Sequence, residues 1–259
     1  MSRFLNLPLA LQRSFEQHSV LKIISGLANF DQSSIESIAR SAFIGGADLI
    51  DIACDSHLVG AAIKASSIPV CVSAVDPELF PSAVEAGAVM VEIGNFDSFY
   101  AKGRCFAAKE VLSITIKTRK LLPNIFLSAT VPHHLPLDQQ TQLAMQLVDA
   151  GADLIQTEGG TSAIPQSPGI TGLIEKATPT LASVHSISKG FSMAGCQSHI
   201  LCASGLTPVT VPMAISIGAS GVGVGSAVNG LASDLERIAM IRSLREGIDS
   251  SLKVNSCNF

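Results

Sequence analysis

One short pattern occurs four times in this chain and constrains its fold more than any other feature. Each copy is a glycine followed by a small residue and a short, mostly apolar run, and the copies begin at Gly46, Gly87, Gly151 and Gly218. Glycine just past an amphipathic helix adopts the left-handed cap conformation, and an apolar run after it suits a strand buried on both faces. Each copy therefore predicts the end of a helix followed by a buried parallel strand.

The spacing of the copies indicates how many strands the chain contains. The glycines are 41, 64 and 67 residues apart. Such gaps exceed one strand-and-helix unit of about 25–35 residues and fit two, so the copies mark alternate strands of an array of eight. The predicted strands cover residues 21–26, 48–54, 69–75, 89–94, 124–130, 153–158, 198–204 and 221–224. The predicted helices cover residues 31–46, 56–67, 105–122, 138–150 and 170–190, after a lead-in helix over 3–18.

Strands and helices alternate without a linker or a change of composition. This regularity favours an α/β fold of the (β/α)8 TIM barrel type, with parallel strands and a short N-terminal lead-in helix, over an open doubly wound sheet. The length of 259 residues and the hydrophobic content of 47% suit one large core. We expect a single domain over residues 1–259, with the barrel proper at about 21–247.

Composition excludes several classes of partner. The net charge is −4, charged residues make up 15% of the chain, and there is no run rich in lysine and arginine, which argues against nucleic acid or an anionic membrane. The six cysteines form no C-x-x-C pair, which suits reduced thiols and argues against structural zinc. No apolar run reaches the roughly 18–20 residues that span a bilayer. We therefore expect a soluble protein.

Polar residues recur at one position of the repeated pattern. Five residues after each glycine come Asp51, Glu92, Gln156 and Gly223. The outer face of each strand packs under apolar helices, so a carboxylate in the middle of a strand points most easily into the barrel. These positions predict one polar layer inside the barrel. Two residues further along lie Ala53, Gly94, Glu158 and Gly225, which predict a second layer that is small except for Glu158 and leaves space for a ligand.

Two carboxylates in one buried layer need a cation or a shared proton. Lys22 lies on the inward parity of its predicted strand and is the natural partner of Asp51 and Glu92. One interpretation is a catalytic cluster. The other is a structural network of ion pairs that fixes the layering, since such networks also perturb pKa values.

Two glycine-containing loops follow the last two predicted strands. They contain Ser204 and Gly205 in one loop, and Gly223, Gly225 and Ser226 in the other. In a barrel of this type, the loops after the seventh and eighth strands commonly bind phosphate through backbone N–H groups, aided by a following helix turn. The alternative is that both loops are tight turns needed only for packing.

Two other patterns allow a metal or a proton relay. Adjacent His133 and His134 follow the fifth predicted strand, but neighbouring residues in extended chain point to opposite sides, so we favour a plain surface loop. Asp51 and Asp55 could hold a divalent cation, although the polar layer and a helix cap explain both residues equally well. We therefore predict no metal site.

Four stretches, residues 22–31, 71–80, 91–100 and 155–162, closely resemble the hypothetical chloroplast reading-frame family of algal plastids and cyanobacteria, a domain of unknown function. The resemblance covers nearly the whole chain and implies a plastid stroma, or a cytoplasm if the source is cyanobacterial. The sequence also resembles the wider ribulose-phosphate-binding barrel group of sugar-phosphate epimerases, isomerases and thiazole synthases. It departs from Schiff-base aldolases, since Gln156 and Glu158 stand where those usually offer lysine.

These observations predict a barrel that binds a phosphorylated small molecule and catalyses proton transfer, as an isomerase, epimerase, lyase or synthase does. Proton abstraction needs acids and a base in contrasting environments. We predict that Glu158 is the general base and that the charge of Lys22 stabilises an enolate. Asp51 and Glu92 are predicted to hold Lys22 in place. No cofactor is required on this reading. The alternatives are a flavin mononucleotide-binding barrel and a non-catalytic metabolite-binding or regulatory protein. The sequence is also compatible with a homo-oligomer.

Overall fold

Eight parallel strands close into a barrel in the computed structural model, which describes residues 3–100, 102–159 and 164–256. Each strand pairs with its neighbours in chain order, and the first pairs with the last. The strands are β1 (Val20–Gly26), β2 (Leu49–Ala53), β3 (Val70–Ala74), β4 (Met90–Ile93), β5 (Phe126–Val131), β6 (Leu154–Thr157), β7 (His199–Ala203) and β8 (Gly221–Val224). The predicted TIM barrel is confirmed.

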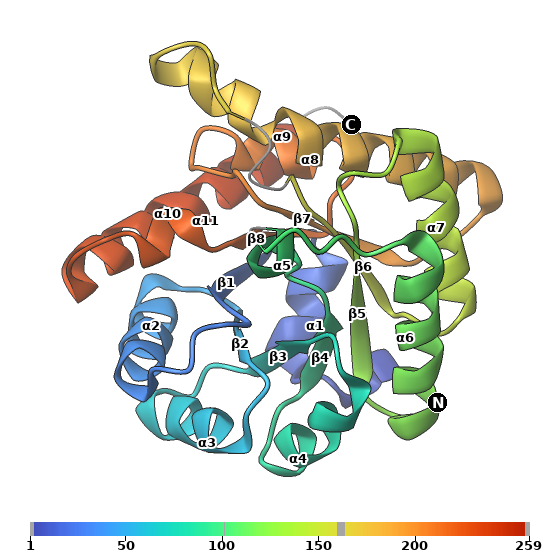
Figure 1. Ribbon diagram of the computed structural model, residues 1–259. Coiled ribbons are helices and arrows are strands. Elements are labelled where there is room, and N and C mark those ends of the chain that lie inside the picture. The colour runs from blue at the N-terminus through green and yellow to red at the C-terminus, as the bar shows by residue number, and fades with distance from the viewer. Residues whose placement is uncertain (1–2, 101, 160–163, 257–259) are drawn as a thin grey trace.

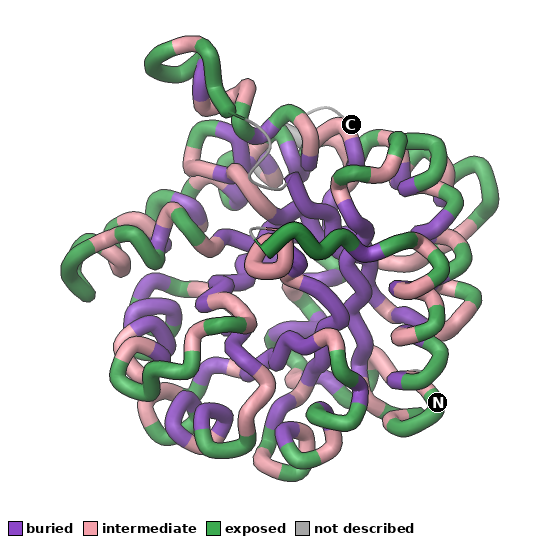
Figure 2. The backbone as a smooth tube through the Cα atoms, in the orientation of Figure 1, coloured by how far each residue is buried: buried purple, intermediate pink, exposed green. Residues whose placement is uncertain are grey.

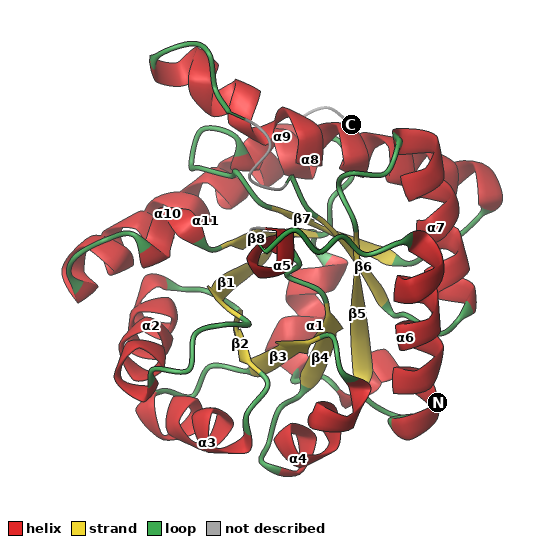
Figure 3. Cartoon of the chain, viewed as in Figure 1, coloured by secondary structure: helices red, strands yellow, loops and turns green. Residues whose placement is uncertain are grey.

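Helices surround this ring of strands (Figures 1 and 3). The α-helices are α1 (Leu9–Glu16), α2 (Gln32–Gly45), α3 (Ser56–Ala65), α4 (Phe80–Glu85), α5 (Asp97–Tyr100), α6 (Ala108–Leu121), α7 (Leu137–Asp149), α8 (Gly169–Ala194), α9 (Val211–Ser216), α10 (Ser226–Asn229) and α11 (Asp234–Ser256). Two 3-10 helices are η1 (Arg3–Asn6) and η2 (Pro77–Leu79). Figure 2 shows the strands buried while the helices expose their outer sides, as expected for parallel strands that are covered by helices.

The four pattern glycines occupy the predicted positions. Gly46, Gly87, Gly151 and Gly218 have φ angles of 87°, 113°, 102° and 107°, and they precede β2, β4, β6 and β8. A residue with a Cβ is strained in this left-handed region, so glycine ends each helix and turns the chain into the next strand. The alternate-strand interpretation of the repeats is thereby confirmed.

The amino-terminal end of the barrel is closed by apolar side chains and by α1. The inward residues at this end include Leu49, Met90, Phe126 and Leu154, and Phe15 of α1 packs against them with 0% exposure. Figure 1 shows α1 behind the strands, at the end opposite the site described below. This apolar floor leaves the carboxyl ends of the strands as the open end of the barrel.

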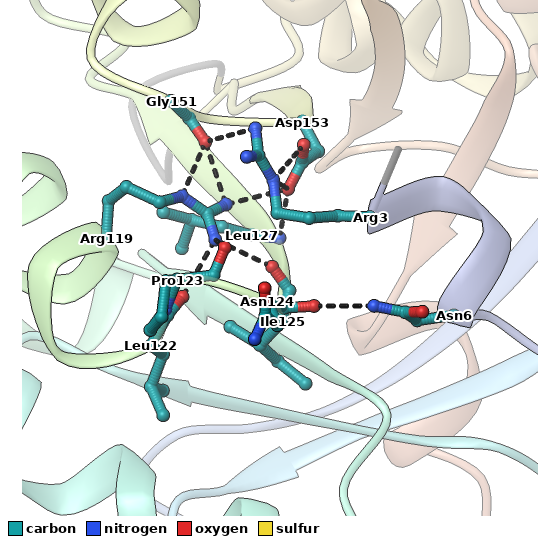
Figure 4. A network of polar contacts seen from close by, with 10 residues as sticks. All are labelled: Arg3, Asn6, Arg119, Leu122, Pro123, Asn124, Ile125, Leu127, Gly151 and Asp153. Atoms are coloured by element: carbon teal, nitrogen blue, oxygen red, sulfur yellow. Dashed lines mark hydrogen bonds and ion pairs between the residues drawn. The ribbon is translucent and has the colours of Figure 1, made fainter. Parts of the chain in front are cut away.

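A charged network fastens the N-terminal segment to this end (Figure 4). Asp153, at the start of β6, accepts hydrogen bonds from Arg3 Nε at 2.8 Å and from Arg119 Nη2 at 2.7 Å. Arg119 also donates to the backbone oxygen atoms of residues 122, 123, 125 and 151. One half-buried carboxylate therefore joins η1, α6 and β6.

Two segments differ from the sequence-based expectation. The predicted loop over residues 95–104 contains the short helix α5, whose role in the site was not foreseen. The predicted helix over 170–190 is longer and passes through Pro179, and its first turns project from the barrel (Figure 1, gold). Gly160, Thr161 and Ser162 of the predicted loop after β6, and Cys257, lie outside the described residues.

Candidate functional site

A polar layer lies directly above the apolar floor. Lys22 Nζ donates to Glu92 Oε2 at 2.5 Å and lies 3.9 Å from Asp51 Oδ2, and all three side chains are fully buried. Ser128 Oγ donates to Glu92 at 3.0 Å, and Ser73 Oγ donates to Asp51 at 2.6 Å. The structure thus brings together the three charged residues that the repeat predicted for one layer.

Burial and charge act against each other in this layer. Burial alone would lower the pKa of Lys22, but the charges of Glu92 and Asp51 outweigh it and hold the pKa above its usual value. Burial raises the pKa of Asp51 to about 6, against the opposing charge of Lys22. Lys22 therefore stays charged, and the pKa of Asp51 lies above its ordinary value.

This asymmetry predicts a pH dependence of stability. A raised carboxyl pKa means that the folded protein binds the proton more tightly than the unfolded chain does. The contribution of Asp51 is therefore complete below its ordinary pKa of 3.8 and is lost as the pH rises to about 6. We expect the unfolding free energy of wild type, relative to Asp51→Asn, to fall by about 1–3 kcal/mol between pH 4 and pH 7. Urea unfolding of both proteins measures this difference, and a rise with pH would contradict the assignment.

Gln156 connects the polar layer to the space above it. Its Nε2 donates to Glu92 Oε1 at 2.6 Å and to Thr130 Oγ1 at 3.3 Å. An ionised carboxylate can only accept, so this contact fixes which way the amide points. Gln156 Oε1 is buried and has no hydrogen-bond partner among the described residues. A buried acceptor without a donor costs roughly 1–3 kcal/mol, so it points to a missing partner.

A cavity of about 120 Å³ lies above Gln156, at the carboxyl ends of β5 to β8. It is lined by Ile24, Asn95, Asp97, Thr130, Gln156, Thr157, Glu158, Ala203, Ser204, Gly205, Leu206, Gly223, Val224, Gly225 and Ser226. All five residues predicted to bind phosphate are in this set, and lysine and arginine are absent from it. Lys22, Asp51 and Glu92 lie below the cavity and do not line it.

The two glycine loops bring bare backbone to the cavity. Ser204 and Gly205 both have a positive φ, of 79° and 70°, and a Cβ on Gly205 would lie 2.6 Å from the backbone oxygen of Lys176. Only glycine fits there, and the left-handed serine before it is a strained conformation of the kind often found at functional sites. Gly225 stands before the short helix α10, the usual place of the extra helix in phosphate-binding barrels.

Glu158 reaches the cavity wall, held by two residues from other loops. Its Oε1 accepts hydrogen bonds from the Tyr100 hydroxyl, from the His133 backbone N–H at 3.0 Å and from His133 Nδ1 at 3.0 Å. Since the carboxylate only accepts, Nδ1 of His133 carries the proton. The hydrogen bond to Glu158 raises the pKa of His133, against burial. No hydrogen bond from the described residues engages Oε2.

Asp97, the first residue of α5, is a second carboxyl group at the cavity. Its Oδ1 is buried and has no hydrogen-bond partner among the described residues. Burial raises the pKa of Asp97, the charge of Glu158 adds to the rise, and His133 opposes it. The cavity is therefore lined by two carboxyl groups in contrasting environments. Oε1 of Glu158 accepts hydrogen bonds, whereas Oδ1 of Asp97 has no donor among the described residues.

Sequence reasoning missed part of this arrangement. The prediction that His133 lies in a plain surface loop was wrong, because its ring is half-buried against Glu158 and Tyr100. Tyr100 and Asp97 were not singled out, although a lone tyrosine in a long loop after a strand was a usable signal. Asp55 caps α3 by accepting from the Leu58 N–H at 3.0 Å, as the helix-cap interpretation held. Among the described residues, no group of three or more His, Cys, Asp or Glu side chains is arranged to hold a metal ion.

Known structures share this architecture. Thiamine phosphate pyrophosphorylase from Pyrococcus furiosus is 16% identical, with a TM-score of 0.60 over 91% of this chain and 98% of that one. (S)-3-O-geranylgeranylglyceryl phosphate synthase from Thermoplasma acidophilum, in complex with its substrate sn-glycerol-1-phosphate, is 15% identical, with a TM-score of 0.60 over 94% and 100%. At these identities, the likeness shows the barrel fold. None of the described helices has both the length and the apolar character that a bilayer span requires.

Sequence comparison gives a more specific relationship. The uncharacterized protein ycf23 of Cyanophora paradoxa is 41% identical over 237 residues, which cover 91% of this chain and 95% of the relative. The family described as a protein of unknown function (DUF561) matches residues 6–254. The matched span contains both the polar layer and the cavity. The resemblance to the chloroplast reading-frame family is confirmed, and the chain belongs to the DUF561 family.

Proposed function

We propose that the protein binds a phosphorylated small molecule in the cavity above Gln156 and catalyses proton transfer on it. The observation that carries this proposal is the shared cavity: the two glycine loops and Glu158 line the same space of about 120 Å³. A phosphate group and an adjacent reacting carbon fit there together. Two barrels that share the fold add support, because one is a thiamine phosphate pyrophosphorylase and the other is a phosphate synthase in complex with sn-glycerol-1-phosphate.

The phosphate would lie between the two loops. Gly205 and Gly225 line the cavity and would offer backbone N–H groups, and Ser204 and Ser226, which also line it, would add hydroxyl groups. Binding an anion without lysine or arginine depends on these oriented dipoles, which act strongly in an enclosed site. Because the two glycine loops carry no charged side chain, the phosphate would be recognised there by shape and hydrogen bonding.

Glu158 is the proposed general base. Three hydrogen bonds to Oε1 fix its carboxylate, and Oε2 is left to take a proton from a carbon next to a carbonyl group. Asp97, whose pKa is raised by burial, is the second carboxyl group at the cavity and is suited to accept a hydrogen bond from a hydroxyl group of the ligand. The pair would support isomerase, epimerase or lyase chemistry.

Lys22, Asp51 and Glu92 act as positioning residues in this proposal. They do not line the cavity, so in this proposal Lys22 acts on the ligand through other residues and not by direct contact. Glu92 instead holds the amide of Gln156 in one orientation, and Lys22 holds Glu92. The charged layer would thus present Gln156 Oε1 to the ligand. Since contributing residues come from β1 to β8, we propose that residues 1–259 work as one domain.

Substitution of Gly225 tests the phosphate site. We expect Gly225→Asp to abolish binding of phosphorylated compounds, because its carboxylate would occupy the anion position and repel the ligand. A Cβ added at this position would lie 3.1 Å from the backbone oxygen of Ile24. Gly225→Ala is therefore the matched control, because it adds this crowding without a charge. A thermal-shift screen of phosphosugars and nucleotides measures binding, with the unliganded melting temperature reporting folding. Binding that survives Gly225→Asp places the phosphate elsewhere.

We also propose a location and a set of partners. The ycf23 relative supports a plastid stroma, or a cytoplasm in a cyanobacterial source. The chain's net charge of −4 and lack of basic runs speak against nucleic acid as a partner. A metabolite ligand therefore remains the partner that the site supports best.

A further inference from the structure

Two oxygen atoms at the cavity lack a donor, and they belong to different elements. Gln156 Oε1 projects from β6, and Asp97 Oδ1 projects from α5. Gln156 is 1% exposed and both residues line the cavity of about 120 Å³. In a folded protein, almost every buried polar atom has a partner, so two acceptors without donors around one small space are a feature of that space.

The orientation of Gln156 cannot be reversed to remove this feature. Its Nε2 faces Glu92 Oε1 at 2.6 Å, and rotating the amide would set two acceptors against each other. Its free oxygen lies toward Gly223, since a Cβ on that glycine would be 3.5 Å from Oε1. The acceptor therefore sits beside the loop proposed to hold phosphate.

A phosphate group does not satisfy these atoms. Phosphate oxygen atoms are acceptors at neutral pH, and they repel a carboxylate and gain nothing from an amide oxygen. What satisfies both is a donor on the ligand, close to the phosphate. A hydroxyl group supplies such a donor, and an amide oxygen and a carboxylate oxygen can both accept from it.

We infer that Gln156 Oε1 and Asp97 Oδ1 form an acceptor subsite that selects phosphate monoesters carrying a hydroxyl group one or two carbons from the phosphorylated carbon. This inference rests on the proposed function, because it presumes that the phosphate lies at the glycine loops. A cavity of this volume holds a phosphate and a two- or three-carbon hydroxylated part. An adjoining cavity of about 520 Å³, lined by residues that include Leu27, Asn29 and Asn229, receives the rest of a longer ligand.

The adjoining cavity shares part of its lining with the first. Ile24, Asn95, Asp97, Gly225 and Ser226 line both. Asn95 Nδ2 donates to Asp51 Oδ2 at 2.7 Å, and Asn229 Nδ2 donates to the backbone oxygen of Ile24 at 2.8 Å. Their remaining polar atoms are side-chain oxygens. Both compartments therefore offer acceptors, which suits a ligand with several hydroxyl groups.

A matched pair of probes tests the subsite. Glycerol 3-phosphate and n-propyl phosphate share charge and chain length, and they differ only in two hydroxyl groups. With the full chain in EDTA, we expect calorimetry to show that glycerol 3-phosphate binds at least about tenfold more tightly than n-propyl phosphate. Asp97→Ala should reduce this ratio toward one. Ser98→Ala is the control, because Ser98 is the next residue of α5 and lines only the adjoining cavity, and it should keep the ratio.

The outcomes separate the inference from the function on which it rests. Equal binding of both probes by wild type, or a preference that survives in Asp97→Ala, overturns the acceptor subsite and leaves phosphate binding intact. A preference that appears only with added Mg²⁺ overturns direct recognition by the two oxygens. If neither probe nor inorganic phosphate binds, the proposed function itself fails. Asp97 makes no hydrogen bond through Oδ1 in the described chain, so Asp97→Ala should fold, and its melting temperature checks this.

Discussion

Lys22→Met should destabilise the fold by roughly 3–5 kcal/mol, the usual cost of leaving a buried charge without its partner. The substitution keeps the length of an apolar side chain but removes the only cation that contacts Glu92 and Asp51 among the described residues. Glu92 would keep its hydrogen bonds from Ser128 and Gln156, which do not neutralise its charge. Urea unfolding, followed by circular dichroism, measures the loss.

The double variant Lys22→Met/Glu92→Gln is the matched control for this result. It removes the cation together with its nearest anion. The amide oxygen of the new glutamine can still accept from Gln156, and its NH2 group can donate to the rotatable hydroxyl of Ser128. We expect it to recover a large part of the lost stability, because replacing both members of a buried pair costs less than removing one. A double variant as unstable as Lys22→Met would show that the lysine matters for packing rather than for charge.

Glu158→Gln should lower the rate of proton exchange by about 10²–10⁴, the range for losing a general base, with ligand binding largely kept. Glutamine preserves the shape of the side chain and an oxygen that can accept from Tyr100. The measurement is deuterium uptake from D₂O at the carbon next to the carbonyl group of a phosphorylated ketose, such as ribulose 5-phosphate, by proton NMR. Thermal shift with the same compound reports binding.

Tyr100→Phe is the control that separates the base from its surroundings. It removes one donor from Oε1 and leaves the carboxylate, so exchange should fall by only about tenfold. Undiminished exchange in Glu158→Gln would remove Glu158 from the mechanism. If wild type binds phosphorylated ketoses but exchanges none of their hydrogens, the non-catalytic alternative replaces the enzyme.

The repeated glycines explain why the fold could be predicted. A helix end, a buried strand and a fixed parity are local properties, and they recur at Gly46, Gly87, Gly151 and Gly218. From them follow the eight strands and the inward direction of Asp51 and Glu92. The positions of the loops at Gly205 and Gly225 at the carboxyl end of the barrel could also be predicted, because chain order places these loops after the last two strands.

The rest of the site depends on how deep each side chain lies in the barrel and on contacts between residues that are far apart in the sequence. Parity tells which way Lys22 points but not how far it lies below the mouth, which depends on the stagger of the strands. Tyr100 and Glu158 are 58 residues apart in the chain, and His133 and Glu158 are 25 apart. No local pattern encodes these meetings, because they arise where separate loops fold over the same barrel end.

The polar layer is unevenly charged across the width of the barrel. Lys22, Asp51 and Glu92 come from β1, β2 and β4, whereas the corresponding residues of β7 and β8 are Ala203 and Gly223. One half of the cross-section thus carries all the formal charge of the layer, and the opposite half is neutral and small. In the proposed function, a phosphate dianion would lie over the neutral half, away from Asp51 and Glu92. A bound metabolite would thereby have a single head-to-tail direction before any of its own functional groups is recognised.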